Sequence, residues 1–214
     1  MLLALLLGLA DAGHVEAKGG AIVYTAPDGK TTVLSSDPHD RDPVLSPDGT
    51  RVAYVHDESP PLTGAPSFGD EPLGALMLVD VATGRSCRLI GPRPSDDPRN
   101  QLRGLRAPLF SPDGRTLYID AAEWVTSDAL HRVDAATGAE SYVIDGSAEQ
   151  VVARGKYAGW LLVGRHKYYK SKQGGSYKSL DAVSPDGKRH FEIAGANGED
   201  TEAAGAAWLK RNGG

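Results

Sequence analysis

The hydrophobic and polar positions of the chain repeat an eleven-residue pattern. It occurs as LSPDGTRVAYV from Leu45 to Val55 and as FSPDGRTLYID from Phe110 to Asp120. In both copies a short apolar run leads into Ser-Pro-Asp-Gly, which is typical of a tight turn. The residues after the glycine alternate with a period of two, as they do in a β-strand. The pattern therefore predicts a β-hairpin that turns at SPDG.

A second repeated segment follows each copy. It reads LVDVATGRSCRLIG over 78–91 and RVDAATGAESYVIDG over 132–146, and it predicts another hairpin that turns at Ala-Thr-Gly. Each complete unit then holds four strands, here named a, b, c and d in chain order. The two units span roughly 43–91 and 106–146. Four-stranded units of this length are typical of β-propeller blades, which stack on their neighbours to bury both faces.

Other segments follow the pattern in part. Residues 149–195 predict a third unit with a turn at Arg154-Gly155-Lys156 and with SPDG in the place of the second turn. Residues 21–34 predict a lone second-type hairpin, and residues 202–211 are expected to form a lone first strand. Pairing of that strand with the N-terminal hairpin would close a ring of about four blades and cover two sheet edges. The alternative is an incomplete, open array.

The composition agrees with an all-β fold in a single domain. The chain has 214 residues with 26 Gly and 14 Pro, which favours many short elements over long helices. Its net charge of −5 argues against nucleic acid as a main partner, because phosphate binding needs a concentrated basic face. We therefore predict a small or incomplete β-propeller of about four blades over residues 13–214.

The first residues resemble an export signal. Leu2 to Ala10 form a short apolar run, and Ala10-Asp11-Ala12 fits a small-x-small cleavage pattern, with Ala17 as a second site. Because the run is too short to span a bilayer, we expect residues 1–12 to be a signal segment and the mature chain to have no membrane span. No Lys or Arg precedes the run. Two alternatives therefore stay open: a longer signal with a wrongly assigned start, and a buried N-terminal segment.

The repeated segments also resemble a known family. The two SPDG segments, each followed by a VDxATG segment, look like the PD40 or WD40-like β-propeller repeats of TolB-type proteins, and the resemblance covers roughly residues 21–195. It implies a β-propeller fold and a location in the bacterial periplasm or outside the cell. Such propellers occur in periplasmic scaffolds, in toxin-related proteins and as gating domains of serine peptidases, so no single function is implied. The chain has fewer repeats than TolB and lacks its separate N-terminal α/β domain.

The sequence contains no recognisable catalytic or cofactor motif. It has no G-x-S-x-G segment for a nucleophilic serine and no H-E-x-x-H spacing among its six histidines. Cys87 is the single cysteine, which excludes an internal disulfide and a cysteine-based metal site. We therefore expect no enzymatic activity, no cofactor and no metal.

Two groups of carboxylates have more than one interpretation. DPHDRD, from Asp37 to Asp42, gathers His39 with three carboxylates, which suits a metal or acid–base cluster, but its Asp-Pro start favours a polar loop between strands. Asp80, Asp134 and Asp181 recur just before the second turn of each unit. We expect these three to cap that turn.

Two long connections between strands b and c are the candidate binding loops, because loops on a rigid scaffold carry function. The candidate contacts in residues 56–74 are Asp57, Glu58, Phe68, Asp70 and Glu71. Those in residues 165–178 are Arg165, Lys167, Tyr168, Tyr169, Lys170, Lys172 and Tyr177. Basic residues interleaved with tyrosines suit an acidic protein or a polyanion. Equivalent connections of a propeller lie on one face, so the loops are expected to form one binding face.

We expect a non-enzymatic, exported, TolB-like propeller that is a monomer and binds another protein through these loops. An immunity protein against a periplasmic toxin is a narrower form of this hypothesis. The alternative class is a carbohydrate- or small-ligand-binding propeller, which needs exposed aromatic platforms. Of the three tryptophans, Trp160 lies in an apolar strand and is expected in the core, Trp124 is the exposed candidate, and Trp208 stands near the C-terminus.

Overall fold

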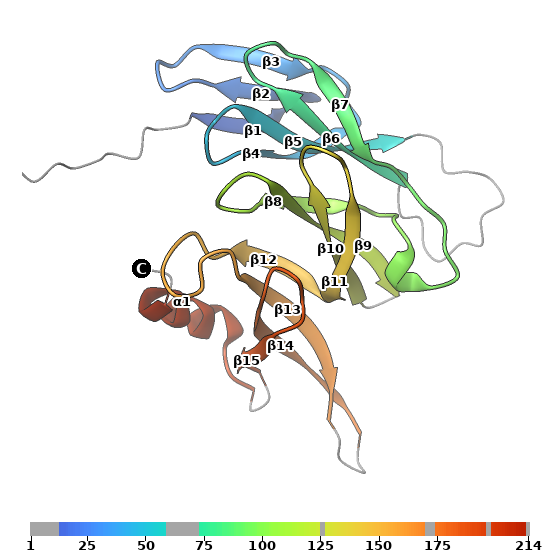
Figure 1. The fold of residues 1–214 in the computed structure, drawn as a ribbon, viewed down its shortest axis with the longest axis vertical. Coiled ribbons are helices and arrows are strands. Elements are labelled where there is room, and N and C mark those ends of the chain that lie inside the picture. The colour runs from blue at the N-terminus through green and yellow to red at the C-terminus, as the bar shows by residue number, and fades with distance from the viewer. Residues whose placement is uncertain (1–12, 59–72, 125–126, 170–173, 196–197, 213–214) are drawn as a thin grey trace, which may run out of the picture.

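The protein is built from antiparallel sheets in series. A computed structural model describes residues 13–58, 73–124, 127–169, 174–195 and 198–212. Within these ranges the chain forms four sheets, one short 3-10 helix and one α-helix (Figure 1). Strand order in every sheet follows chain order, so each sheet is a simple meander. This confirms the predicted all-β fold, a small propeller of about four blades.

The four sheets are here called blades 1 to 4. Blade 1 contains β1 (His14–Lys18), β2 (Ala21–Thr25) and β3 (Thr31–Ser35). Blade 2 contains β4 (Asp40–Leu45), β5 (Arg51–Glu58), β6 (Leu73–Asp80) and β7 (Ser86–Ile90). Blade 3 contains β8 (Arg106–Phe110), β9 (Thr116–Trp124), β10 (Ser127–Asp134) and β11 (Glu140–Asp145). Blade 4 contains β12 (Ser147–Val151), β13 (Leu161–Tyr168), β14 (Ser176–Val183) and β15 (His190–Ala194). The 3-10 helix Pro98–Asn100 lies between blades 2 and 3, and α1 (Thr201–Asn212) follows blade 4.

The blades stack in chain order, with blade 1 at one end of the array and blade 4 at the other (Figure 1). The first strands of successive blades, β1, β4, β8 and β12, contact one another in that order. Among the described strands, none of blade 4 pairs with blade 1. In this part of the chain the array is therefore open, which is the alternative to the closed ring.

The SPDG segments form the tight turns that the sequence predicts. In the first of them Gly49 N donates to Ser46 O at 2.9 Å, and Gly49 has a φ of +72°, which glycine adopts readily. Ser46 Oγ donates to Asp48 Oδ1 at 2.6 Å and accepts from Arg51 N at 2.9 Å. The same three bonds recur in the other two SPDG segments, the last of which joins strands c and d.

The middle strands bury both of their faces between neighbouring blades. In β5, Val52 and Tyr54 pack toward blade 1 and its Ile22, whereas Ala53 and Val55 pack toward blade 3. Successive side chains of a strand point to opposite faces of its sheet. The alternation along β5 therefore separates two cores rather than a core from solvent.

Neighbouring blades also touch through the c–d turns. Gly138 of blade 3 has a φ of +71°, and an added Cβ would lie 2.5 Å from the carbonyl oxygen of Leu89 in blade 2. Gly187 of blade 4 approaches the carbonyl oxygen of Val143 in blade 3 in the same way. Because Leu89 and Val143 each stand five positions after the c–d turn glycine of their own blade, this contact repeats with the blades.

The closing strand expected over 202–211 is wrong, because this segment belongs to α1. Asp200 Oδ1 accepts from Glu202 N and Ala203 N at 3.0 and 3.1 Å, as an N-cap does. Four alanines in the segment favour helix over strand. Trp208 packs into a cluster with blade 4, so α1 covers the face that a further blade would cover.

Candidate binding face

Charged side chains gather at the end of the blades where strands b end and strands c begin, opposite the SPDG turns. We call this the b–c end, and the far ends of β13 and β14 mark it in Figure 1. Its half-buried ion pairs include Arg41–Asp57, Arg106–Asp128, Arg165–Asp181 and Lys167–Asp181. Each pair joins two strands of one blade, so these charges first stabilise the blades that carry them.

Asp57, expected as a binding residue, is a structural partner of Arg41. Nε and Nη2 of Arg41 donate to the two carboxylate oxygens at 2.7 and 2.8 Å, and Nη2 also donates to Leu105 O at 2.9 Å. Leu105 directly precedes blade 3, so Arg41 links two blades. Arg106 has the equivalent place in blade 3 and pairs with Asp128. Arg41 and Arg106 each stand two positions before a proline near the start of strand a, and their ion pairs stabilise the fold.

The rest of the predicted acidic loop contributes one described contact. Glu58 pairs with Arg88 at 2.7 Å, and both side chains are more than a third exposed. Exposed pairs of this kind contribute little to stability. Five of the candidate binding residues lie outside the described ranges: Phe68, Asp70, Glu71, Lys170 and Lys172. For these five the binding role stays a prediction.

The base of the β13–β14 hairpin is an ionic cluster around Asp181. The Asp181 side chain is fully buried, and it accepts from Lys167 Nζ at 2.7 Å and from Arg165 Nη1 at 3.1 Å. Lys167 Nζ also lies 2.9 Å from Glu192 Oε2, and Arg165 Nε donates to Asp145 O of blade 3 at 2.8 Å. Burial raises the pKa of Asp181, but the hydrogen bonds and charges of Lys167 and Arg165 outweigh it and hold this pKa below its ordinary value.

Arg165 and Lys167 are thus neutralised within the chain, and Tyr168 and Tyr169 just beyond them are exposed. Tyr168 is 70% exposed and Tyr169 is 43% exposed. The rings of Tyr169 and Tyr177 lie 4.7 Å apart between centroids, and the ring of His166 lies 5.1 Å from that of Tyr168. Of the described residues predicted in this loop, Tyr168 and Tyr169 are therefore the ones with large exposed rings.

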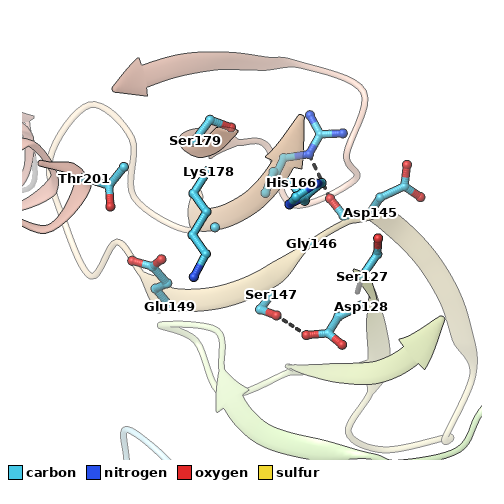
Figure 2. Close-up of a pocket in the computed structure, with 12 residues that line it drawn as sticks. Ser127, Asp128, Asp145, Gly146, Ser147, Glu149, His166, Lys178, Ser179 and Thr201 are labelled. Atoms are coloured by element: carbon cyan, nitrogen blue, oxygen red, sulfur yellow. Dashed lines mark hydrogen bonds between the residues drawn. The ribbon is translucent and has the colours of Figure 1, made fainter. Parts of the chain in front are cut away.

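A polar pocket of about 290 Å³ lies between blades 3 and 4, next to the first residue of α1 (Figure 2). Asp128 and Asp145 line it from blade 3, and Glu149, His166 and Lys178 line it from blade 4. In Figure 2 the Lys178 side chain points toward β12, the strand that carries Glu149. Carboxylates on both sides together with a lysine from blade 4 suit a polar or charged group of a ligand. Composition alone did not reveal this pocket, because its walls come from two blades.

Asp120 lies behind the pocket wall and is 3% exposed. Its Oδ1 accepts from Ala148 N at 3.0 Å, which joins β9 of blade 3 to β12 of blade 4. Burial is the main cause that raises the pKa of Asp120 to about 7, and the nearby carboxylate of Asp128 adds to the shift. Asp120 is therefore an acid whose charged form is disfavoured in the folded state.

Replacing Asp120 by asparagine is expected to stabilise the protein increasingly as the pH rises. Because the pKa of Asp120 is higher in the folded state, about 7, than in the unfolded state, about 4, ionisation of Asp120 lowers the stability of the parent as the pH rises between these two values. Asparagine cannot ionise and keeps an oxygen for Ala148 N. The advantage of the variant over the parent should grow by about 2 kcal/mol between about pH 5 and about pH 8. Urea unfolding of both chains at both pH values measures it.

Comparing the variant with the parent also cancels the pH dependence that other titratable groups contribute to stability. Burial and the charge of Asp145 raise the pKa of Glu123 to about 7, and Glu123 is present in both chains. Its contribution therefore cancels in the difference. An advantage of Asp120→Asn that is the same at both pH values would contradict the raised pKa of Asp120.

The turn-capping role holds for Asp80 and Asp134 and is wrong for Asp181. Thr83 N and Thr137 N donate to the carboxylates of Asp80 and Asp134, both at 2.8 Å. In blade 4 the c–d turn is an SPDG segment that begins at Ser184, so Asp181 lies three residues earlier, inside β14. The SPDG segment in place of Ala-Thr-Gly was the sequence signal that Asp181 does not occupy the turn position of Asp80 and Asp134.

The tryptophans favour a structural role over a carbohydrate platform where they are described. Trp208 is 6% exposed, and its ring centroid lies 5.0 Å from that of Tyr157. Trp160, expected in the core, is partly buried with its ring 5.1 Å from Tyr157. Arg189 lies 5.3 Å above the Trp160 ring. The Trp124 side chain is not among the described groups.

Comparisons with known proteins identify the fold. No protein-family model and no curated protein matches the chain. A putative TolB from Agrobacterium tumefaciens is similar with a TM-score of 0.53 and 14% identity, over 82% of this chain and 56% of that chain. The tricorn protease is similar with a TM-score of 0.55 and 11% identity, over 87% of this chain and 17% of that chain. The β-propeller domain of the Trilobed protease from Pyrococcus furiosus is similar with a TM-score of 0.53 and 12% identity, over 81% of this chain and 48% of that chain.

These likenesses confirm the resemblance to TolB-type propellers at the level of the fold. The chain spans about half the length of the TolB structure that it matches. TolB and protease propellers share the fold, so the fold alone assigns no activity. In the described part of the chain no helix is long and apolar enough to cross a membrane.

Proposed function

We propose that this chain is a non-enzymatic, exported propeller protein that binds another protein through the b–c end of its blades. The β13–β14 hairpin is the principal contact, with Tyr168, Tyr169 and Tyr177 as its binding residues. The observation that carries the proposal is the exposure of Tyr168 and Tyr169, two large apolar side chains that lie side by side in sequence at the end of β13. Tyrosine is enriched in protein interfaces.

The hairpin is presented on a rigid base. Each of its strands has eight residues, and the Asp181 cluster ties Arg165 and Lys167 down at its root. Figure 1 shows the two strands extending beyond the rest of blade 4. A contact segment that is already ordered loses less conformational entropy on binding. The basic residues therefore act by positioning the tyrosines.

The pocket between blades 3 and 4 supplies the polar part of the same face. His166 and Lys178 are paired residues of β13 and β14, and both line the pocket. The pocket therefore begins where the exposed tyrosines end. A partner that covers the tyrosines can place a charged or polar group against Lys178, Glu149 or Asp128. Such an arrangement, an aromatic anchor beside polar groups, is common in protein interfaces.

The non-enzymatic part of the proposal rests on the state of the acidic groups. Asp181 is held in ion pairs, and Asp120 lies behind a strand. Neither carboxyl is placed to contact a substrate. The export part rests on the apolar run from Leu2 to Ala10. Because β1 begins at His14, cleavage after Ala12 would keep this strand, and we propose that site over Ala17.

Replacing Tyr168 and Tyr169 together by alanine is expected to weaken partner binding by at least about tenfold, because truncated aromatic anchors lose much of an interface's energy. The chain from Gly13 onward is immobilised, periplasmic and culture extracts are passed over it, and the retained protein is identified and titrated. The matched control is Val33→Ala, since Val33 is 62% exposed on blade 1.

The control should retain the same protein with unchanged affinity. If the double tyrosine variant binds that protein as tightly as the parent, the hairpin is not the contact. If the Val33→Ala control loses the protein as well, the retention is nonspecific adsorption to exposed apolar side chains and does not support the hairpin as the binding contact.

A further inference from the structure

The connection between blades 1 and 2 brings together three side chains with metal-binding atoms. Asp37 lies between β3 and β4, Asp40 begins β4, and His56 stands opposite Asp40 on β5. One donor atom of each residue lies within 4.8 Å of the other two. His56 Nδ1 and Asp40 Oδ1 are 2.7 Å apart. Asp37 and Asp40 are close together in the sequence, whereas His56 reaches them only through the pairing of β4 with β5.

Among the described residues, no lysine or arginine pairs with Asp40, and a protonated His56 would be its one ion-pair partner. The Asp40 side chain is 2% exposed, and in the described part of the chain it bonds to the Ser35 hydroxyl and to His56. By contrast, Asp57 and Asp181 at the same end are each held by an arginine. A buried carboxylate needs a cation or several hydrogen bonds to remain charged. A metal ion bound to Asp40 and to neutral His56 would supply the balancing charge in place of a proton on His56.

The surrounding chain holds the two carboxylates in place. His39 N and His39 Nδ1 both lie 2.9 Å from Asp37 Oδ1, and Asp40 N donates to Asp37 O at 3.1 Å. Within the described residues, Asp37 Oδ2 takes no hydrogen bond and is available to a ligand. Asp57 N donates to His39 O at 3.0 Å, which fixes the loop to β5. Ligands that are ordered beforehand bind an ion with little reorganisation.

We propose that Asp37, Asp40 and His56 bind a divalent transition-metal ion of the zinc type. Zinc binds imidazole nitrogen and carboxylate oxygen at about 2.0–2.2 Å in tetrahedral geometry, which places two of its ligand atoms about 3.3–3.6 Å apart. The three ligand atoms lie within 4.8 Å of one another, and binding one ion requires the 2.7 Å contact between His56 and Asp40 to open by less than about 1 Å. Calcium and magnesium prefer oxygen ligands alone, which makes His56 the residue that selects the class of ion. The site ties the loop before β4 to β5, and it is independent of the tyrosine contact.

Zinc titration of the full chain, freed of metal with a chelator, tests the site. Isothermal titration should show one ion per chain, and zinc should raise the melting temperature because the ion binds the folded state. His56→Gln and Asp37→Asn should each weaken zinc binding by at least about tenfold. The Asp37 side chain is 45% exposed, so its variant removes a ligand without disturbing a buried charge.

His190→Gln is the matched control, because His190 is an exposed histidine at the start of β15. This control should bind zinc as tightly as the parent, and circular dichroism should show that all variants are folded. The proposal is overturned if the parent shows no saturable one-to-one binding at micromolar zinc. It is also overturned if both ligand variants bind zinc as the parent does, since another group then holds the ion.

Discussion

Replacing Asp181 by alanine is expected to lower the free energy of unfolding by about 3–5 kcal/mol. The substitution leaves Arg165 and Lys167, which are 17% and 23% exposed, without the carboxylate that neutralises them. It also removes the acceptor of the Ser179 hydroxyl, which lies 3.0 Å from Asp181 Oδ1. Urea unfolding at neutral pH, followed by circular dichroism, measures the loss.

The destabilisation by Asp181→Ala should depend on pH in a defined direction. Because the folded-state pKa of Asp181 is lowered, its stabilisation is present above the ordinary value of about 4 and is lost as the pH falls through the folded value. Glu192→Ala removes the more exposed partner of Lys167 and should cost less than about 1 kcal/mol. A loss for Asp181→Ala no larger than that for Glu192→Ala would show that Asp181 does not hold the hairpin base.

Replacing Gly138 by alanine is expected to cost about 2–4 kcal/mol of stability. Part of the loss arises because alanine is strained at a φ of +71°. The larger part arises because the new Cβ would stand 2.5 Å from Leu89 O, so that blades 2 and 3 must move apart. Thermal and urea unfolding of the variant measure the total.

Gly84→Ala separates the two causes. Gly84 occupies the same turn of blade 2 with a φ of +67°, but an added Cβ there meets nothing within 4 Å. It should therefore cost only the backbone strain, about 1 kcal/mol. The difference between the variants reports the contact between blades. Equal losses for Gly84→Ala and Gly138→Ala would contradict close stacking of blades through the c–d turns.

The sequence predicts most of the fold because its turns are local. An SPDG or ATG turn is specified by the conformations of Pro, Asp and Gly and by side-chain bonds over two to five positions, as at Ser46. Strand alternation then follows from the turn. The helix at 201–212 was not predicted, because the expectation of ring closure favoured a strand there, whereas the alanines and the cap at Asp200 favour a helix. Local propensity decided that segment.

The candidate site was predicted only in part, because burial and pairing depend on strands far apart in sequence. In the sequence Arg165 and Lys167 belong to a basic segment that suits a binding patch. In the structure both pair with Asp181, which lies about fifteen positions later in the chain. In the same way His56 joins Asp40 only through the pairing of β4 with β5. Tyr168 and Tyr177, expected in a loop, lie in β13 and β14, and the exposure of Tyr168 and Tyr169 is a property of the folded hairpin.

Amide hydrogen exchange on the complex with the captured partner tests most directly whether the protein binds through the β13–β14 hairpin. We expect exchange to slow at residues 166–169 and 174–178 when the partner is bound. Exchange at the turn of blade 1, residues 26–30, should stay unchanged, because that turn lies at the opposite end of the strands. Slowed exchange at the SPDG turns with no change in the hairpin would place the partner on the other end and contradict the proposal.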